Sequence, residues 1–299
     1  MRALVCHAYG PIEALKIEDI PTPRPKAGEV LIRVGATGVS FAAMLGVQGK
    51  HQNKPPLPYV PGNEIAGHVV EVGPGVTNVK VGQRVTTGVS QGGFAEYAVA
   101  IAANVITIPE IMPYAQATNF PTLYPTAYGA LKWKADMKPG EVLLVHGAGG
   151  GSGLTGIEVG KAMGAVVIAS AGGADKLEAA RDAGADHLID YRKEDLRARV
   201  LEITGGRGAD VIYDPVGGSA FDVSLRCIAP EGRLIPMGFA SGTIPQIPAN
   251  ILLVKNVTVI GFYYGYWNGW GGKNEPSPKE AAALAKRRAM VADAQRELM

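Results

Sequence analysis

The stretch that decides the fold is Glu141-Val142-Leu143-Leu144-Val145-His146-Gly147-Ala148-Gly149-Gly150-Gly151-Ser152-Gly153. Its apolar residues do not alternate with polar ones, which is typical of a strand covered on both faces. The glycines that follow open a helix, which we expect to extend to about Met163. Within the run, Ala148, Gly150 and Gly153 have the spacing of the dinucleotide-binding fingerprint, with alanine at the first position.

Small residues in this turn let the backbone approach a pyrophosphate, whose charge meets the free N–H groups at the start of the helix. The last glycine lets the helix pack closely on the strand. The alternative is a glycine-rich turn without a ligand, but the strand before it and the helix after it favour a nucleotide site. The candidate cofactor-binding residues of the run are Ala148, Gly150, Gly151, Ser152 and Gly153.

Strands and helices alternate from Lys138 onward. Further strands are predicted at 165–170, 187–190, 209–214, 233–237 and 257–262, and helices at 175–183, 193–203 and 219–228. Six such strands predict an α/β fold with a doubly wound parallel sheet. A last helix begins near Ser277 with a capping-box spacing and continues to Met299.

Residues 1–120 have a different character, with short β-like runs separated by proline and glycine. They predict a compact, partly open β-barrel. The first helix that the pattern predicts in the chain covers about 124–135.

The end of the second predicted strand distinguishes the two nicotinamide dinucleotides. An NAD site places Asp or Glu there to bind the ribose 2′-hydroxyl, whereas this chain reads Ser170-Ala171-Gly172-Gly173. Asp175 fits a helix N-cap better. Lys176 can reach a 2′-phosphate, Gly172 leaves room for it, and Tyr191 with Arg192 can complete the pocket. This pattern favours NADPH, although Lys176 can also be read as a solvated helix lysine.

Composition excludes several classes of function. The net charge of +2 and the lack of a basic stripe predict no nucleic-acid partner. No stretch approaches the roughly 18 apolar residues of a membrane span, and the N-terminus lacks a signal-peptide core. We therefore expect a cytoplasmic protein without a membrane partner. Cys6 and Cys227 are too few for a disulfide framework and are read as buried hydrophobes.

Several motifs together resemble the medium-chain dehydrogenase/reductase superfamily, specifically its zinc-free quinone oxidoreductase branch. The resemblance covers Met1 to about Tyr266 and is carried by the segments at 61–67, 92–97, 126–128, 145–153 and 213–218. It implies a GroES-like β-rich substrate domain at 1–120, joined by 267–299. It also implies a Rossmann domain at 121–266, which binds NADPH in the cleft between the two domains.

The resemblance also indicates which branch this chain departs from. Zinc-dependent members have Cys in place of Ser40 and His in place of Asn63, and their structural zinc lobe is missing between Val85 and Gly92. Since a catalytic zinc needs three protein ligands, no metal site is predicted. The family implies further cofactor contacts at Ser40, Thr126, Gly238 and Phe239. It implies substrate contacts at His51 and Asn63, although a solvent-exposed loop histidine is an equal reading of His51.

Two more departures concern activity and length. Quinone reductases usually have Asn at Ser40 and Asp at Ala43. Relatives also continue beyond Met299, so we hypothesise a truncated or naturally shortened chain with a substrate domain open on one side. The apolar edge strand at 257–262 predicts a homodimer.

Three functions follow. The first is hydride transfer from NADPH to a quinone or similar electrophilic carbonyl acceptor, with no obligate protein catalyst. The second is reduction of an activated C=C bond in an enone or enoyl substrate. The third is an NADPH-binding sensor with little turnover.

Overall fold

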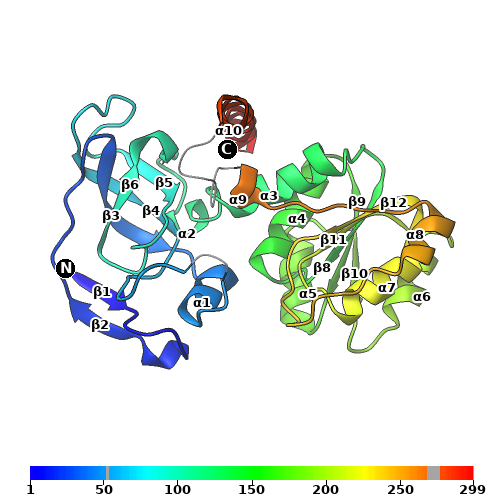
Figure 1. The fold of residues 1–299 in the computed structure, drawn as a ribbon. Helices are drawn as coiled ribbons and strands as arrows, with labels where there is room; N and C mark the ends of the chain where they lie inside the picture. The colour runs from blue at the N-terminus through cyan, green and yellow to red at the C-terminus, as the bar shows by residue number, and fades with distance from the viewer. Residues whose placement is uncertain (52–53, 268–276, 299) are drawn as a thin grey trace. The chain divides into compact units, whose positions relative to one another are not determined.

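The computed structural model describes residues 1–51, 54–267 and 277–298. These residues form two compact units, Met1–Thr122 with Gln295–Met299, and Leu123–Ala294. Figure 1 shows the β-rich first unit and the mixed α/β second unit. The predicted assignment of 267–299 to the β-rich domain stays a prediction, and its residues 268–276 and 299 lie outside the described residues.

The first unit is built on a five-stranded antiparallel sheet. Its order is β6 (Tyr97–Ile101), β3 (Glu29–Thr37), β4 (Glu64–Val72), β5 (Arg84–Gly88) and β7 (Ile106–Thr107). A separate two-stranded sheet pairs β1 (Arg2–Val5) with β2 (Lys16–Asp19). Val30, Ile32 and Ile65 are fully buried on one face of the larger sheet. This architecture confirms the predicted GroES-like class.

Short helices in this unit were not predicted. They are η1 (Ile12–Ala14), α1 (Phe41–Val47), η2 (Ala102–Asn104) and α2 (Tyr114–Ala117). Ser40 is the N-cap of α1, and its Oγ accepts a hydrogen bond from the Ala43 N–H at 3.2 Å. Seven residues contain too few turns for an apolar period to identify a helix, so these short helices before 124–135 were missed.

The second unit contains a six-stranded, wholly parallel sheet, which confirms the doubly wound prediction. Its order is β10 (His187–Asp190), β9 (Val166–Ala171), β8 (Val142–His146), β11 (Ala209–Asp214), β12 (Ile228–Pro236) and β13 (Thr258–Val259). The order reverses between β8 and β11, and ligands of such sheets bind at this reversal, beyond the carboxyl ends of the strands.

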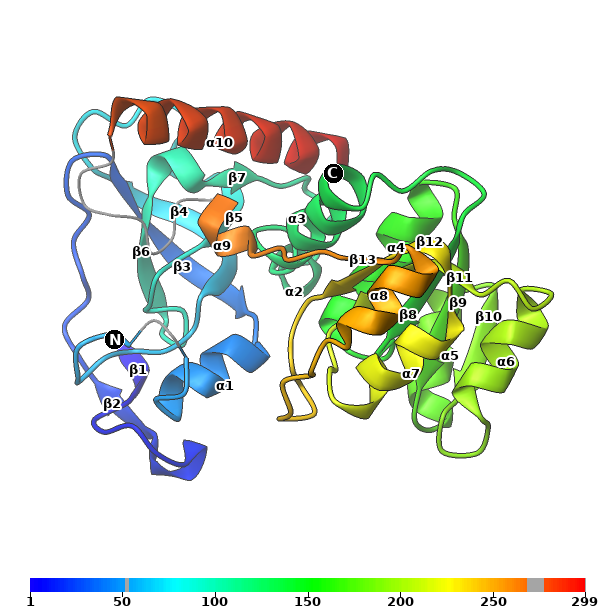
Figure 2. The ribbon, with the colours of Figure 1, turned by 45° about the vertical axis from the view of Figure 1, so that its right-hand side comes forward.

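Helices cover both faces of this sheet (Figure 2). The crossover helices are α4 (Gly151–Ala162), α5 (Ala174–Asp182), α6 (Leu196–Ile203) and α7 (Ser219–Cys227). The helix predicted at 124–135 consists of α3 (Leu123–Tyr128) and a π-helical turn, η3 (Gly129–Lys134). Two short helices were not predicted, α8 (Ala249–Lys255) and α9 (Tyr264–Trp267), and α10 (Pro278–Leu298) ends the described chain.

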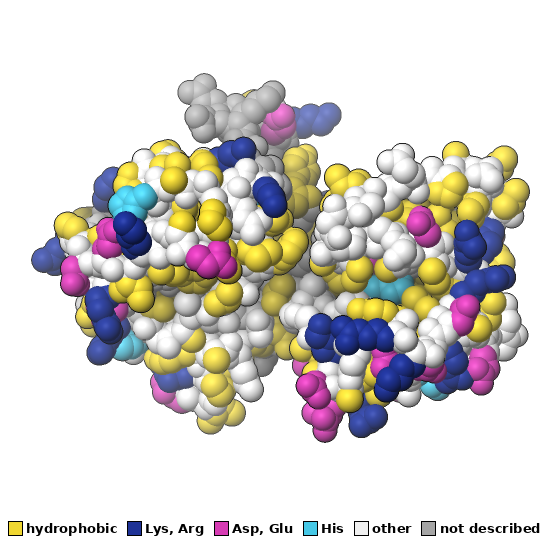
Figure 3. Space-filling view, turned by 90° about the horizontal axis from the view of Figure 1, so that it is seen from below, with side chains coloured by type: hydrophobic (Ala, Val, Ile, Leu, Met, Phe, Trp, Pro, Cys, Tyr) yellow, Lys and Arg dark blue, Asp and Glu magenta, His cyan; other side chains and the backbone are white. Residues whose placement is uncertain are grey.

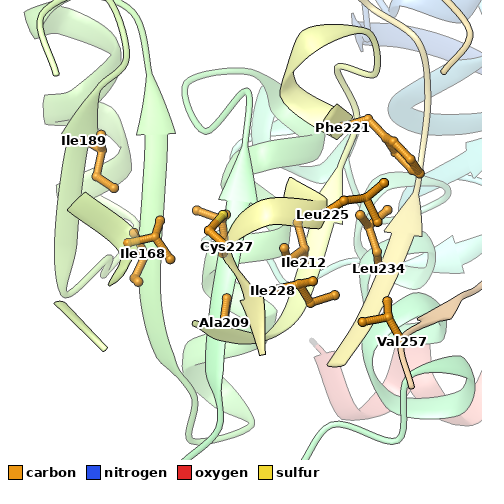
Figure 4. Close-up of a cluster of buried hydrophobic side chains, with 12 residues drawn as sticks. Ile168, Ile189, Ala209, Ile212, Phe221, Leu225, Cys227, Ile228, Leu234 and Val257 are labelled. Atoms are coloured by element: carbon orange, nitrogen blue, oxygen red, sulfur yellow. The ribbon is translucent and has the colours of Figure 1, made fainter. Parts of the chain in front are cut away.

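One hydrophobic cluster of the second unit joins the sheet to helix α7. Figure 4 shows Phe221 and Leu225 of α7 with Ile212 of β11 and Leu234 of β12. Cys227 belongs to the same cluster, where burial raises the pKa of its thiol to about 11. The other cysteine, Cys6, is also buried, so both behave as the small hydrophobes that were predicted.

The surface gives two further observations. Figure 3 shows the molecule from below, and on that face of both units Lys and Arg side chains are interspersed with Asp and Glu. Within the described part of the chain, every helix is too short or too polar to cross a bilayer.

Candidate cofactor site

The turn between β8 and α4 is held by backbone contacts that admit no side chain at its last glycine. A Cβ at Gly153 would lie 2.4 Å from the carbonyl oxygen of Gly147 and 2.7 Å from Cα of Ala148. Glycine is therefore required where helix and loop touch, which is the role of the third fingerprint position.

Two predicted cofactor residues keep the shape of this turn. The Ala148 N–H donates to the Ser170 carbonyl on the neighbouring strand at 3.1 Å, and the Gly150 N–H donates to the Gly147 carbonyl at 3.0 Å. These donors are occupied within the protein. Ala148 and Gly150 thus position the backbone rather than offering their own N–H groups to a ligand.

The start of helix α4 offers the N–H groups that a phosphate needs. Gly150 is the N-cap and supplies no side-chain cap, and its carbonyl accepts the helix's first bond, from the Leu154 N–H at 2.8 Å. The N–H groups of Gly151, Ser152 and Gly153 precede that bond and have no partner within the helix. Together with the positive end of the helix dipole, they form a site for an anion.

Several hydrogen bonds of buried polar groups near this turn were not predicted from the sequence. The Ser152 Oγ lies 3.0 Å from the Tyr213 Oη, and burial raises the pKa of that phenol to about 12. Asp214, the last residue of β11, accepts from the N–H groups of Val216 and Gly217 at 2.8 and 3.0 Å. These bonds fix the turn after β11, and the signal for them was a polar residue ending an apolar strand.

His146 is the last residue of β8, the strand that pairs with β11. Its Nε2 lies 2.7 Å from the Ser224 Oγ of α7, and burial lowers the pKa of the imidazole. The neutral ring therefore ties the strand to a helix, which is a structural role.

A cavity of about 280 Å³ lies at the end of β9 and is lined by residues 172–176 and Arg192. A Cβ at Gly172 would lie 2.6 Å from the Arg192 Nε and 2.8 Å from the Tyr191 Oη. The structure thus brings together the four residues predicted around a 2′-phosphate, Gly172, Lys176, Tyr191 and Arg192.

Lys176 also connects this cavity to the glycine turn. A Cβ at Gly149 would lie 2.5 Å from Cβ of Lys176, so the lysine stem packs on the turn. Asp175 is not the helix N-cap that was predicted. Gly173 caps α5 with φ of 104°, a left-handed conformation that favours glycine. Asp175 therefore falls in the first turn and lines the cavity beside Lys176 and Arg192.

A larger cavity, of about 620 Å³, lies beyond the ends of β12 and β13. It is lined by 236–239, 261–263, Tyr266, Trp267 and Lys134. The candidates Gly238 and Phe239 are in its wall. Thr126 is half-buried on α3 and is not among the lining residues. Since β9 and β12 stand on opposite sides of the strand-order reversal, the two cavities flank the glycine turn.

The remaining candidates belong to the first unit. The Asn63 Nδ2 donates to the carbonyls of Val89 and Ser90 at 3.2 and 2.8 Å, which anchors the turn after β5. His51 is half-buried, and its backbone N–H donates to the Leu45 carbonyl. Over residues 1–51, 54–267 and 277–298, no three His, Cys, Asp or Glu side chains are grouped so as to hold a metal ion.

Comparisons with known proteins agree on one family. The family "Alcohol dehydrogenase GroES-like domain" matches residues 26–110, and "Zinc-binding dehydrogenase" matches residues 151–275. A quinone oxidoreductase-like protein 2 homolog of Nematostella vectensis is 42% identical over 88% of this chain and 72% of its own length. The human quinone oxidoreductase is 34% identical over 87% and 79%.

A solved structure extends the likeness to three dimensions. The crystal structure of Escherichia coli quinone oxidoreductase, described as complexed with NADPH, matches with a TM-score of 0.82 and 29% identity. The match covers 98% of this chain and 89% of that one.

The Gly153 contact predicts a large effect for one added methyl group. Gly153→Ala should lower the free energy of unfolding by about 1–3 kcal/mol, because the new Cβ collides with backbone. Gly150→Ala is the control, since its Cβ would lie an ordinary 3.5 Å from the Gly147 oxygen. Urea unfolding followed by circular dichroism measures both, and equal losses would contradict the steric explanation.

Proposed function

Because the chain belongs to the medium-chain dehydrogenase/reductase superfamily, in its zinc-free quinone oxidoreductase branch, we propose that it is an NADPH-dependent oxidoreductase. Its acceptor is a quinone or a similar electrophilic carbonyl compound, and no metal takes part. The observation that carries the proposal is the open N-terminus of α4 beside a cavity lined by Lys176 and Arg192.

The residues present fit NADPH chemically. Three N–H groups at 151–153, at the open start of helix α4, can bind a pyrophosphate. The cavity at the end of β9 holds two cations and one carboxylate, so its net charge favours a 2′-phosphate. Tyr191, which is 52% exposed, stands at the same place. The larger cavity beyond β12 then takes the nicotinamide end, with Gly238 and Phe239 in contact.

When bound, NADPH supplies a hydride from its nicotinamide ring. The chain itself binds, orients and shields the cofactor. The glycine turn fixes the phosphates, and the apolar wall at 236–239 excludes water from the nicotinamide ring. A quinone accepts the hydride and one proton, which water supplies; a role of the Ser40 hydroxyl in this step remains a prediction from the sequence. Contacts of Thr126 with the carboxamide, and of His51 and Asn63 with the acceptor, remain predictions from the family.

Cofactor choice is tested at Lys176. Lys176→Ala should weaken NADPH binding roughly tenfold, because a charge-assisted bond to the 2′-phosphate is lost, and leave NADH binding nearly unchanged. Lys193→Ala is the control, because its side chain is 80% exposed and does not line the cavity. Titrations of the two dinucleotides measure this, and equal losses for both would refute a 2′-phosphate contact.

The acceptor is tested by following NADPH absorbance with a panel of quinones and a panel of enones. We expect turnover with quinones, unchanged after dialysis against a zinc chelator. Faster turnover with enones would favour the double-bond reductase instead. Tight NADPH binding without oxidation by any acceptor would favour a sensor.

Assembly and location are proposed from the sequence. Strand β13 ends the sheet and pairs only with β12 among the described residues. We propose that its free edge pairs with a second copy in a homodimer, in the cytoplasm. Light scattering should give twice the chain mass of 31.2 kDa, and a monomer would overturn the dimer.

A further inference from the structure

The larger cavity of the second unit has walls suited to a flat ring. Phe239, Tyr263 and Tyr266 line it and are 39%, 46% and 61% exposed. Exposed aromatic side chains gathered in one hollow are characteristic of ligand sites. A planar ligand can stack on such rings, with each pair stabilised beyond simple burial.

Aromatic rings at this cavity also pack against one another. Trp267 stacks on Trp133 with ring centroids 4.8 Å apart and an interplanar angle of 9°. Phe262 meets Trp267 edge-on at 5.8 Å. A Cβ at Gly129 would lie 2.6 Å from the ring of Phe262, so the π-helical turn η3 packs directly on this cluster. The turn is thereby fixed where its last residue, Lys134, lines the cavity.

Among the described residues that line the cavity, Lys134 is the only charged one. Its side chain is exposed, and it forms no ion pair with any acidic group of the described chain. None of the lining residues that the structure describes carries a carboxylate to neutralise it. The ammonium group is thus available to an anion bound against the aromatic wall.

A second cation, Arg287 of helix α10, contacts one of the aromatic rings that line the cavity. The guanidinium carbon of Arg287 stands 4.6 Å from the centroid of the Tyr266 ring. Its Nε–H is buried and donates to no partner in the described structure. Arg287 therefore adds positive potential on one side of the Tyr266 ring, upon which a ligand would stack.

We infer that the acceptor is a planar aromatic electrophile with an anionic substituent, which stacks on Tyr263 and Tyr266 and pairs with Lys134. This inference rests on the proposed function. A neutral ring would use only the stacking surface and leave the lysine solvated. An anionic ring uses both, so the cavity selects charge as well as shape.

The test compares two acceptors that differ in charge. The first is 2-hydroxy-1,4-naphthoquinone, a vinylogous acid that is ionised at neutral pH. The second is its neutral methyl ether. For Lys134→Met we expect kcat/KM to fall about fivefold for the anionic quinone, the loss of one exposed ion pair, and to stay within about twofold for the ether. Lys132→Met, a neighbour that does not line the cavity, should change neither.

Binding supplies a second readout. Calorimetric titration of the hydroxyquinone into the enzyme with NADP⁺ should give a Kd about fivefold weaker for Lys134→Met. Equal losses for both quinones, or none for the anion, would overturn the inference. A weaker Kd for NADPH itself would also overturn it, because Lys134 would then pair with a phosphate of the cofactor. If the unaltered enzyme reduces neither quinone, the proposed function fails, and the calorimetric arm still decides the anion site.

Discussion

The contact between helix α4 and the turn after strand β8 is the constraint on which the rest of the second unit depends. With 2.4 Å between a would-be Cβ at Gly153 and the Gly147 oxygen, the helix begins directly against the strand end. This close approach leaves three N–H groups facing outward at the carboxyl edge of the sheet. It also brings the stem of Lys176 against Gly149, so that one turn positions both an anion site and the cation beside it.

The reversal of strand order then separates two chemically different environments. On the β9 side the cavity is small and polar, with Lys176 and Arg192 opposed by the single carboxylate of Asp175. On the β12 side it is larger and aromatic, and Lys134 is the one charged residue among the described residues of its lining. A dinucleotide has the same asymmetry, since its phosphorylated ribose needs cations and its redox-active ring needs a flat, water-poor wall. The fit of both ends to one ligand is stronger support than either cavity alone.

Prediction from sequence succeeded where the determining contacts are local. The strands around β8 were identified because their apolar runs report on neighbours along the chain. The 2′-phosphate contacts of Gly172, Lys176 and Tyr191 remain predictions, although the structure brings these residues together. Prediction failed for α1 and α8, each of seven residues, in which periodicity has too few turns to register. Asp175 was assigned as a cap because the left-handed conformation of Gly173, which starts the helix earlier, is not visible in a residue pattern.

The sequence by itself determined the family and the doubly wound sheet, because motifs and apolar runs are visible along the chain, and it predicted a phosphate site at the glycine turn. Only the tertiary structure decided what surrounds the other end of the site. Lys134, Phe239 and Tyr263 lie far apart in the chain and line one cavity, since β12 and β13 pair and the π-helical turn packs on Phe262. No spacing encodes that meeting, because it depends on how strands, turn and aromatic rings pack in three dimensions.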